Sequence, residues 1–137
     1  MRAARTDANH AAENVTLTLP WPPKELNPNA RMHYMALAKY KKTYRAACAW
    51  QAVAQGIGRM KAKRLDVQLT FYPPNRRARD ADNCLAAMKS GLDGLADVLG
   101  VDDSKWRITF EMADTIGGMV KVEVKNESAI RAARTMG

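Results

Sequence analysis

The sequence predicts a single α/β (α+β) domain, in which one mixed sheet packs against two main helices in the order β-α-β-α-β-β. Two segments, residues 15–19 and 65–72, alternate between apolar and polar side chains, which is typical of half-buried strands. Residues 82–99 instead repeat apolar side chains in steps of three and four, which indicates a helix with one buried face. The length of 137 residues and the apolar fraction of 47% fit one globular domain.

The first half of the chain is predicted to hold one strand and one long helix. Residues 1–13 show no periodicity and are predicted to be a flexible lead-in. The strand at 15–19 ends at a group of prolines, and residues 24–31 are predicted to form a loop. From residue 32 the sequence is rich in alanine and contains neither Pro nor Gly before Gly56, which predicts a helix closed by Gly56 and Gly58.

The second half is predicted to begin with the strand at 65–72, which Pro73-Pro74 ends. The helix at 82–99 follows, and Gly100 stands where a C-terminal cap is expected. Its apolar stripe consists of Leu85, Met88, Leu92, Leu95 and Leu99. Gly91 and Gly94 each weaken a helix by roughly 1 kcal/mol relative to Ala. Two such glycines indicate close packing of this helix against another element or a partner chain.

Two more strands are predicted at 108–112 and 119–124, with Gly117-Gly118 in the turn between them. The predicted domain therefore spans residues 14–125, and a basic tail covers residues 126–137.

The charge of the chain is unevenly distributed. Residues 24–79 contain 13 basic and 2 acidic side chains, whereas residues 80–114 contain 8 acidic and 3 basic ones. The formal net charge of +8 favours a polyanionic partner such as nucleic acid, and a concentrated acidic patch within a basic chain favours a divalent cation.

The sequence also argues against a membrane span, a signal peptide and a zinc site. No run of about 18 apolar residues is present, so no membrane span is expected, and no apolar segment of a signal peptide follows the first residues. The chain is therefore expected to be cytoplasmic. Cys48 and Cys84 lie in helical patterns without zinc-ligand spacing and are predicted to be two buried free thiols.

Four carboxylates in the acidic segment are the candidate site: Asp80, Asp82, Asp102 and Asp103. Each has a purely structural explanation, because Asp favours helix N-caps and turns. On the predicted helix, Asp82, Lys89 and Asp93 share one face. Lys89 either forms a surface ion pair with Asp93 or stabilises charge on a reacting phosphate.

The basic segment supplies candidate DNA contacts. Lys39, Lys42 and Arg45 recur every three residues on the first helix, which fits either a solvated face or a stripe that follows phosphates. The predicted loop at 75–81 carries further bases. The complete set of candidate DNA-binding residues is Arg31, Lys39, Lys42, Arg45, Arg76, Arg77 and Arg79.

These residues resemble the RusA-type Holliday junction resolvases, a family common in phages and prophages, over roughly residues 14–125. The motifs are, in order, Leu19-Pro20-Trp21-Pro22-Pro23, Asn27-Pro28-Asn29-Ala30-Arg31, Arg79-Asp80-Ala81-Asp82-Asn83, Lys89, Leu92-Asp93-Gly94-Leu95 and Val101-Asp102-Asp103-Ser104. The Asp-x-Asp-Asn motif alone is weak, whereas the whole series is specific.

The resemblance implies that Asp80, Asp82 and Asp103 bind Mg²⁺ and form the catalytic set with Lys89, and that Arg79 holds the scissile backbone. Lys89 stands seven residues after Asp82, about one helical turn farther than the lysine of the best-known bacterial member. The family works as a homodimer that nicks two opposed strands of a four-way DNA junction, in DNA recombination and repair.

Two other functions remain open at the level of sequence. The chain is alternatively a non-catalytic basic nucleic-acid-binding module, in which the acidic residues only cap helices. It is alternatively a metal nuclease that acts on other branched DNA or on RNA.

Overall fold

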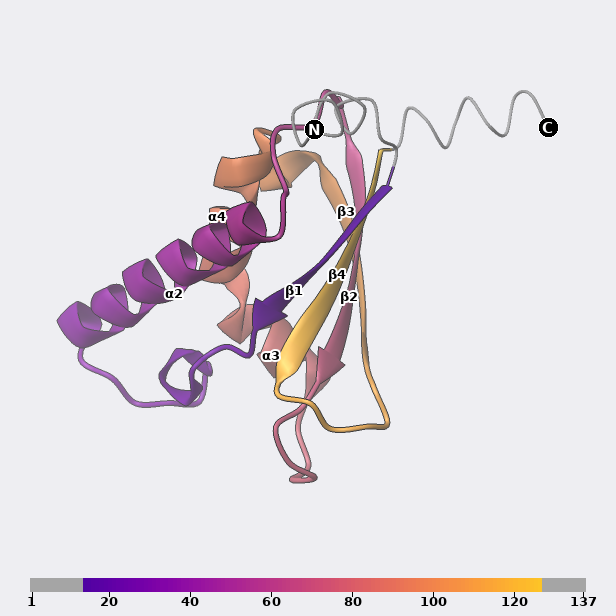
Figure 1. Cartoon of the computed structure of the whole chain (residues 1–137). Coiled ribbons are helices and arrows are strands. Elements are labelled where there is room, and N and C mark those ends of the chain that lie inside the picture. The colour runs from indigo at the N-terminus through magenta and orange to yellow at the C-terminus, as the bar shows by residue number, and fades with distance from the viewer. Residues whose placement is uncertain (1–13, 127–137) are drawn as a thin grey trace.

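The computed structural model describes residues 14–126, and these form one α+β domain with a mixed four-stranded sheet. All of the helices lie on the same side of that sheet (Figure 1). The strands are β1 Asn14–Pro20, β2 Leu65–Tyr72, β3 Trp106–Met112 and β4 Met119–Asn126. The α-helices are α2 Tyr34–Ala54, α3 Ala81–Ala87 and α4 Lys89–Leu99, and the short 3-10 helices are η1 Lys24–Leu26 and η2 Asp103–Lys105.

The core lies between the helices and one face of the sheet. The side chains of β2 alternate between buried and half-buried positions along the whole strand, as its sequence pattern predicts. The buried set of β2 consists of Leu65, Val67, Leu69 and Phe71, and that of β4 consists of Val120, Val122 and Val124. The opposite face carries polar side chains such as Gln68 and Glu123 and is left uncovered by the helices.

The strand order is β1-β4-β2-β3, in which β2 and β3 run parallel and the other pairs run antiparallel. The two C-terminal strands are therefore not neighbours, because β2 lies between them. The turn that contains Gly117-Gly118 bonds to the end of β2, since the Gly117 N–H donates to the carbonyl of Pro73 at 2.8 Å. Gly118 adopts a φ of 74°, a backbone conformation that glycine accepts without strain.

The predicted helix at 82–99 is divided in two, so the domain has three α-helices where two main helices were predicted. Met88 separates α3 from α4 with φ and ψ of −89° and −4°. Hydrogen bonds continue across the break, because the Met88 N–H donates to the carbonyls of Cys84 and Leu85. Met88 is fully buried, so its side chain is part of the core at the point where the helix breaks. The helical segment also begins earlier than predicted, at Ala81, with Asp80 as its N-cap.

Gly91 and Gly94 allow α4 to approach α2 closely. A Cβ atom at Gly94 would lie 2.2 Å from the backbone carbonyl oxygen of Arg45, and one at Gly91 would lie 2.5 Å from the ring of Tyr44. The element against which these glycines pack is thus α2. Tyr44 is itself buried and its hydroxyl donates to the carbonyl of Pro20 at 2.7 Å, which ties α2 to the end of β1.

Other sequence predictions have clear outcomes. Cys48 and Cys84 are both buried and free, as predicted. Gly56 and Gly100 have positive φ angles after α2 and α4, as expected of glycines that end helices, whereas Gly58, which was also predicted to close α2, does not. None of the helices in residues 14–126 has the length and apolarity needed to cross a bilayer. The lead-in at 1–13 and the tail beyond Asn126 lie outside the described residues, whereas Asn126 itself belongs to β4.

Candidate functional site

The polar helix face predicted from the sequence borders a groove of about 650 Å³. Asp82 from α3, Lys89 and Asp93 from α4 and Asp103 from η2 all line it. Its apolar lining consists of Leu26, Leu85, Leu92 and Ile108 together with Ala86 and Ala87. We call it the acidic groove, because three of its five charged residues are carboxylates; the fifth charged residue is Lys41 of α2.

Lys89 forms ion pairs with two carboxylates that line this groove. Its Nζ atom lies 2.5 Å from Oδ2 of Asp103 and 2.8 Å from Oδ1 of Asp93. The hydrogen bond to Asp103, followed by the one to Asp93, raises the pKa of Lys89 above that of an ordinary lysine. Lys89 therefore carries a full positive charge at neutral pH. It suits the stabilisation of negative charge and not the role of a general base.

The adjacent Asp102 and Asp103 have different roles. Asp102 is exposed and caps η2, since its Oδ2 accepts the N–H of Ser104 at 3.0 Å. These hydrogen bonds to Ser104 lower the pKa of Asp102. The side chain of Asp103 is only 25% exposed and faces the acidic groove. The interpretation as a turn residue thus holds for Asp102, and Asp103 is the member of the pair that is available for chemistry.

Asp80 and Asp82 also differ, because they line different hollows. Asp80 is the N-cap of α3, where its Oδ1 accepts the N–H of Asp82 at 2.9 Å. It lines a second pocket and not the acidic groove, which Asp82 lines. Of the predicted set, Asp82, Lys89 and Asp103 thus share one groove, and Asp80 borders the neighbouring pocket.

The chemistry of the donors decides whether a metal suits this groove. Within residues 14–126, no three His, Cys, Asp or Glu side chains converge as a ready-made metal site. Mg²⁺, however, prefers oxygen ligands, keeps several waters and is commonly held by one or two carboxylates. Asp93 and Asp103 already converge on one cation, the ammonium of Lys89. Asp93 and Asp103 thus lie close enough together for both to bind one cation, and of the predicted ligands Asp82 and Asp103 line the same groove.

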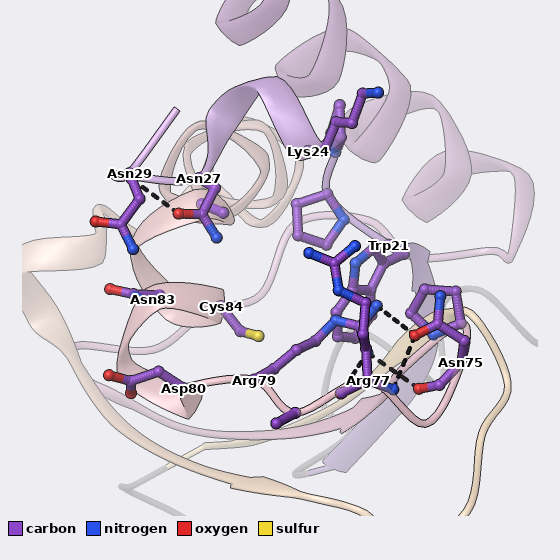
Figure 2. A pocket seen from close by; sticks show the side chains of 15 residues that line it. Trp21, Lys24, Asn27, Asn29, Asn75, Arg77, Arg79, Asp80, Asn83 and Cys84 are labelled. Atoms are coloured by element: carbon purple, nitrogen blue, oxygen red, sulfur yellow. Dashed lines mark hydrogen bonds between the residues drawn. The ribbon is translucent and has the colours of Figure 1, made fainter. Parts of the chain in front are cut away.

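The second pocket has a volume of about 440 Å³ (Figure 2). It is lined by Asn83 and Cys84 of α3, whereas the groove is lined by Asp82, Leu85 and Ala86, so the two hollows lie on different faces of this helix. We call the second pocket the amide pocket, because Asn27, Asn29, Asn75 and Asn83 all line it. Arg79 extends into it, with its Cζ atom 5.6 Å from the centroid of the Trp21 ring. The Arg79 guanidinium is fixed at its other edge by hydrogen bonds of 3.0 Å to the carbonyls of Asn75 and Arg77 and to Oδ1 of Asn75.

The remaining predicted DNA contacts lie in different surroundings. Arg31, Lys39, Lys42, Arg76 and Arg77 are exposed. Arg45 is also exposed, but two hydrogen bonds of 2.9 Å tie it to Asp97 of α4. Arg45, which was predicted to belong to the basic stripe, therefore links α2 to α4.

Sequence reasoning missed several residues that line these hollows. Lys41 lies in the acidic groove, although only its neighbours were placed in the basic stripe. Trp21, Asn75 and Asn83 line the amide pocket, and their positions are too far apart in sequence for any spacing to reveal it. The one available signal was that Trp21 and Asn83 belong to motifs of the family resemblance.

Comparisons with known proteins give no functional name. No family model matches the chain. An uncharacterized protein of Xylella fastidiosa (strain Temecula1 / ATCC 700964) is 44% identical over 94 residues, which cover 66% of this chain and 61% of that protein. The chain thus spans less than two thirds of the length of this relative.

Proposed function

We propose that the chain is a Mg²⁺-dependent, structure-selective endodeoxyribonuclease that resolves four-way DNA junctions by paired nicks in opposed strands. This is the activity implied by the resemblance to RusA-type resolvases. The observation that supports it most is the acidic groove, where Asp82, Lys89 and Asp103 meet from segments that are far apart in sequence. Basic side chains dominate the segment between residues 24 and 79, which fits a polyanionic substrate.

In the proposed site, Asp82 and Asp103 hold the ion, and Asp80 joins them if its carboxylate leaves the cap of α3. Mg²⁺ supplies activation of the attacking water and stabilisation of the charge that builds on the phosphate. If Asp103 held the ion, Lys89 would still have its bond to Asp93, which is 2.8 Å away. Its ammonium then remains oriented in the groove and donates to a phosphate oxygen.

The DNA backbone is held by the basic side chains around the site. Arg76 and Arg77 stand on the loop that leads into α3, directly before the acidic residues. Lys41 lines the acidic groove from α2, and Lys39 and Lys42 are exposed on that helix. Such contacts position a duplex without reading its sequence, which suits an enzyme that selects DNA by shape. A homodimer presents two such sites to opposed strands.

Cleavage of a synthetic four-way junction tests the proposal. We expect nicks in the presence of Mg²⁺, none in EDTA, and none in linear duplex DNA of the same length. Asp82→Asn should abolish cleavage while junction binding in EDTA stays within about threefold of the parent, because the substitution removes a charge and not a phosphate contact. Cleavage by Asp82→Asn at the parental rate would remove Asp82 from the site.

A non-catalytic nucleic-acid-binding module is the second candidate. It is favoured by the caps at Asp80 and Asp102 and by Lys89, which neutralises Asp103 without any ion. In that case Mg²⁺ changes neither the substrate nor the affinity. A panel of flaps, replication forks, linear DNA and RNA separates the third candidate, a metal nuclease with another substrate, from a junction resolvase.

A further inference from the structure

The amide pocket is built differently from a simple phosphate site. Figure 2 shows Asn27, Asn29 and Asn83 on one wall, facing Trp21, Asn75 and Arg77 across an open centre. Its lining also contains apolar surface from Cys84 and Ala87. Burial raises the pKa of the Cys84 thiol, so the sulfur is neutral at physiological pH. The pocket therefore combines amide groups, apolar surface and an ordered guanidinium.

The guanidinium group of Arg79 is held in one orientation by its neighbours. Trp21 lies under the guanidinium, and Phe71 supports Trp21 edge-on with ring centroids 5.9 Å apart. The hydrogen bonds to Asn75 and to the carbonyl of Arg77 fix the plane at its edge. A guanidinium that lies over an aromatic ring and is fixed by hydrogen bonds offers a planar group on which a nucleobase can stack. No carboxylate neutralises Arg79 by an ion pair within residues 14–126, since its partners are carbonyl oxygens.

The amides provide hydrogen-bonding capacity that the fold does not use. The side chains of Asn29 and Asn83 take no part in a hydrogen bond within the described residues, and Asn83 is half-buried. Each amide offers two donors and one carbonyl acceptor, which is the pattern needed to bond the edge of a base. A bare phosphate offers only acceptors, so it would leave the amide oxygens unsatisfied.

The charge of the pocket fits the rest of a nucleotide. Lys24, Arg77 and Arg79 line it against one carboxylate, that of Asp80. An excess of positive charge next to an amide-lined cavity suits a base that is linked to a phosphodiester. The volume of about 440 Å³ lies within the range of pockets that enclose small organic groups.

We infer that the amide pocket binds one unpaired nucleotide of the DNA, stacking its base on Arg79 and bonding its edge through Asn29 and Asn83. This inference rests on the proposed function in that it takes DNA as the ligand. Asp80 lines this pocket and Asp82 lines the acidic groove on the other side of the short helix α3. The pocket thus provides a base contact next to the proposed cleavage site. Moving a base out of the stack costs less free energy at a branch point than within duplex DNA.

Fluorescence of 2-aminopurine tests the pocket without any cleavage. The probe is a single-stranded DNA of about 12 nucleotides with 2-aminopurine at its centre, titrated in EDTA and compared with the same strand in a duplex. We expect the fluorescence of the single strand to rise on binding, because the probe base leaves the neighbouring bases that quench it and enters the amide pocket. Arg79→Lys keeps the charge but removes the plane, and Asn83→Ala removes an amide. Each should weaken single-strand binding by roughly tenfold, since one stacked base contributes about 1–3 kcal/mol.

Arg107→Lys is the matched control, because Arg107 is an exposed arginine of β3 that lines a different hollow, on the face of the sheet that no helix covers. It should bind like the parent and give the same rise in fluorescence, and all variants should melt within about 3 °C of one another. Unchanged fluorescence on binding, or parental affinity of both Arg79→Lys and Asn83→Ala, would overturn the inference. Because the titration excludes Mg²⁺, a rise in fluorescence without any nuclease activity would refute the proposed cleavage and leave the pocket. Junction cleavage without that rise would refute the pocket and leave the proposed cleavage.

Discussion

The acidic groove and the amide pocket lie on either side of α3, and they differ in whether their basic side chain is paired with carboxylates. In the groove, Lys89 is bonded to two carboxylates, so positive and negative side chains satisfy one another. In the pocket, Arg79 is held by carbonyl oxygens and an aromatic ring, and its charge is not cancelled. The carboxylates of the groove therefore already bind a cationic group, whereas the charge of Arg79 is not paired with a carboxylate of the described residues. The two proposals follow from this difference: a cation in the acidic groove and part of a nucleotide in the amide pocket.

After Asp82, the largest effect is expected from Asp103. Asp103→Asn removes a carboxylate charge from the acidic groove and should reduce junction cleavage by about 100-fold or more, as loss of one preorganised electrostatic group does in other enzymes. Single-strand binding at the amide pocket should not change. The measurement is the single-turnover rate with saturating Mg²⁺.

Asp102→Asn is the control for that variant. Asn caps helices as well as Asp does, so η2 should stay intact, and cleavage should remain within about twofold of the parent. If both variants cut at equal rates, Asp103 would have no special role and the groove would not be the cleavage site.

Lys89 should give the next largest effect. Lys89→Met should slow cleavage by roughly 10- to 100-fold at pH 7, because it removes a positive charge near the phosphate. Its side chain is 62% exposed, so the loss of stability should be below about 1 kcal/mol. Thermal melts and cleavage rates measured side by side distinguish the two effects.

The pH dependence of the parent checks the same residue. Since the folded pKa of Lys89 is raised above its ordinary value of 10.5, its charge and its contribution to stability are present below that value. Both are lost only as the pH rises through the higher folded pKa. Cleavage should therefore show no fall caused by Lys89 between pH 7 and about pH 10. A Lys89-dependent fall near pH 8, absent in Lys89→Arg, would contradict this.

Gly94 tests how far the groove depends on helix packing. In Gly94→Ala, the new Cβ meets the carbonyl oxygen of Arg45, so the free energy of unfolding should fall by about 1–3 kcal/mol despite the better helix propensity of Ala. The shift of α4 should also disturb Lys89 and Asp93, whereas the amide pocket has no lining residue on α4. Gly58→Ala is the control, because nothing lies within 4 Å of the position that its new methyl group would take. Urea melts of both variants give the comparison, and equal stabilities would contradict the packing argument.

These residues show which parts of the molecule the sequence can predict. Alternation along β2 predicted its bounds at Leu65 and Tyr72, because that pattern reflects one buried face. The break at Met88 was not predictable, since Met88 fits the apolar stripe of a continuous helix. The position of β2 between β3 and β4 depends on pairing between distant segments, which no local pattern records.

The site was predictable to the same limited extent. The helical spacing of Lys89 and Asp93 predicted their ion pair, and the structure contains it. The family resemblance selected Asp103 over Asp102, and the difference follows from which of the two caps η2. The sequence could not indicate that Asp80, as the cap of α3, borders a different pocket from Asp82. Asp80 and Asp82 are two residues apart at the start of α3, and each residue of a helix is rotated by about 100° relative to the one before it. Their side chains therefore point in nearly opposite directions.

The smallest effect is expected at Arg45, which compares a paired arginine with the unpaired Arg79. Both were predicted to bind DNA, but Arg45 is bonded to Asp97 by two hydrogen bonds of 2.9 Å. A double-mutant cycle of Arg45→Met and Asp97→Asn should give a coupling energy of about 0.2–1 kcal/mol, since the pair is exposed at the surface. Arg45→Met should weaken binding of single-stranded DNA in EDTA by less than about twofold, far below the loss expected for Arg79→Lys. A loss as large as that of Arg79→Lys would show that pairing within the fold does not determine which arginines are free to bind DNA, and the contrast between the groove and the pocket would then need another physical basis.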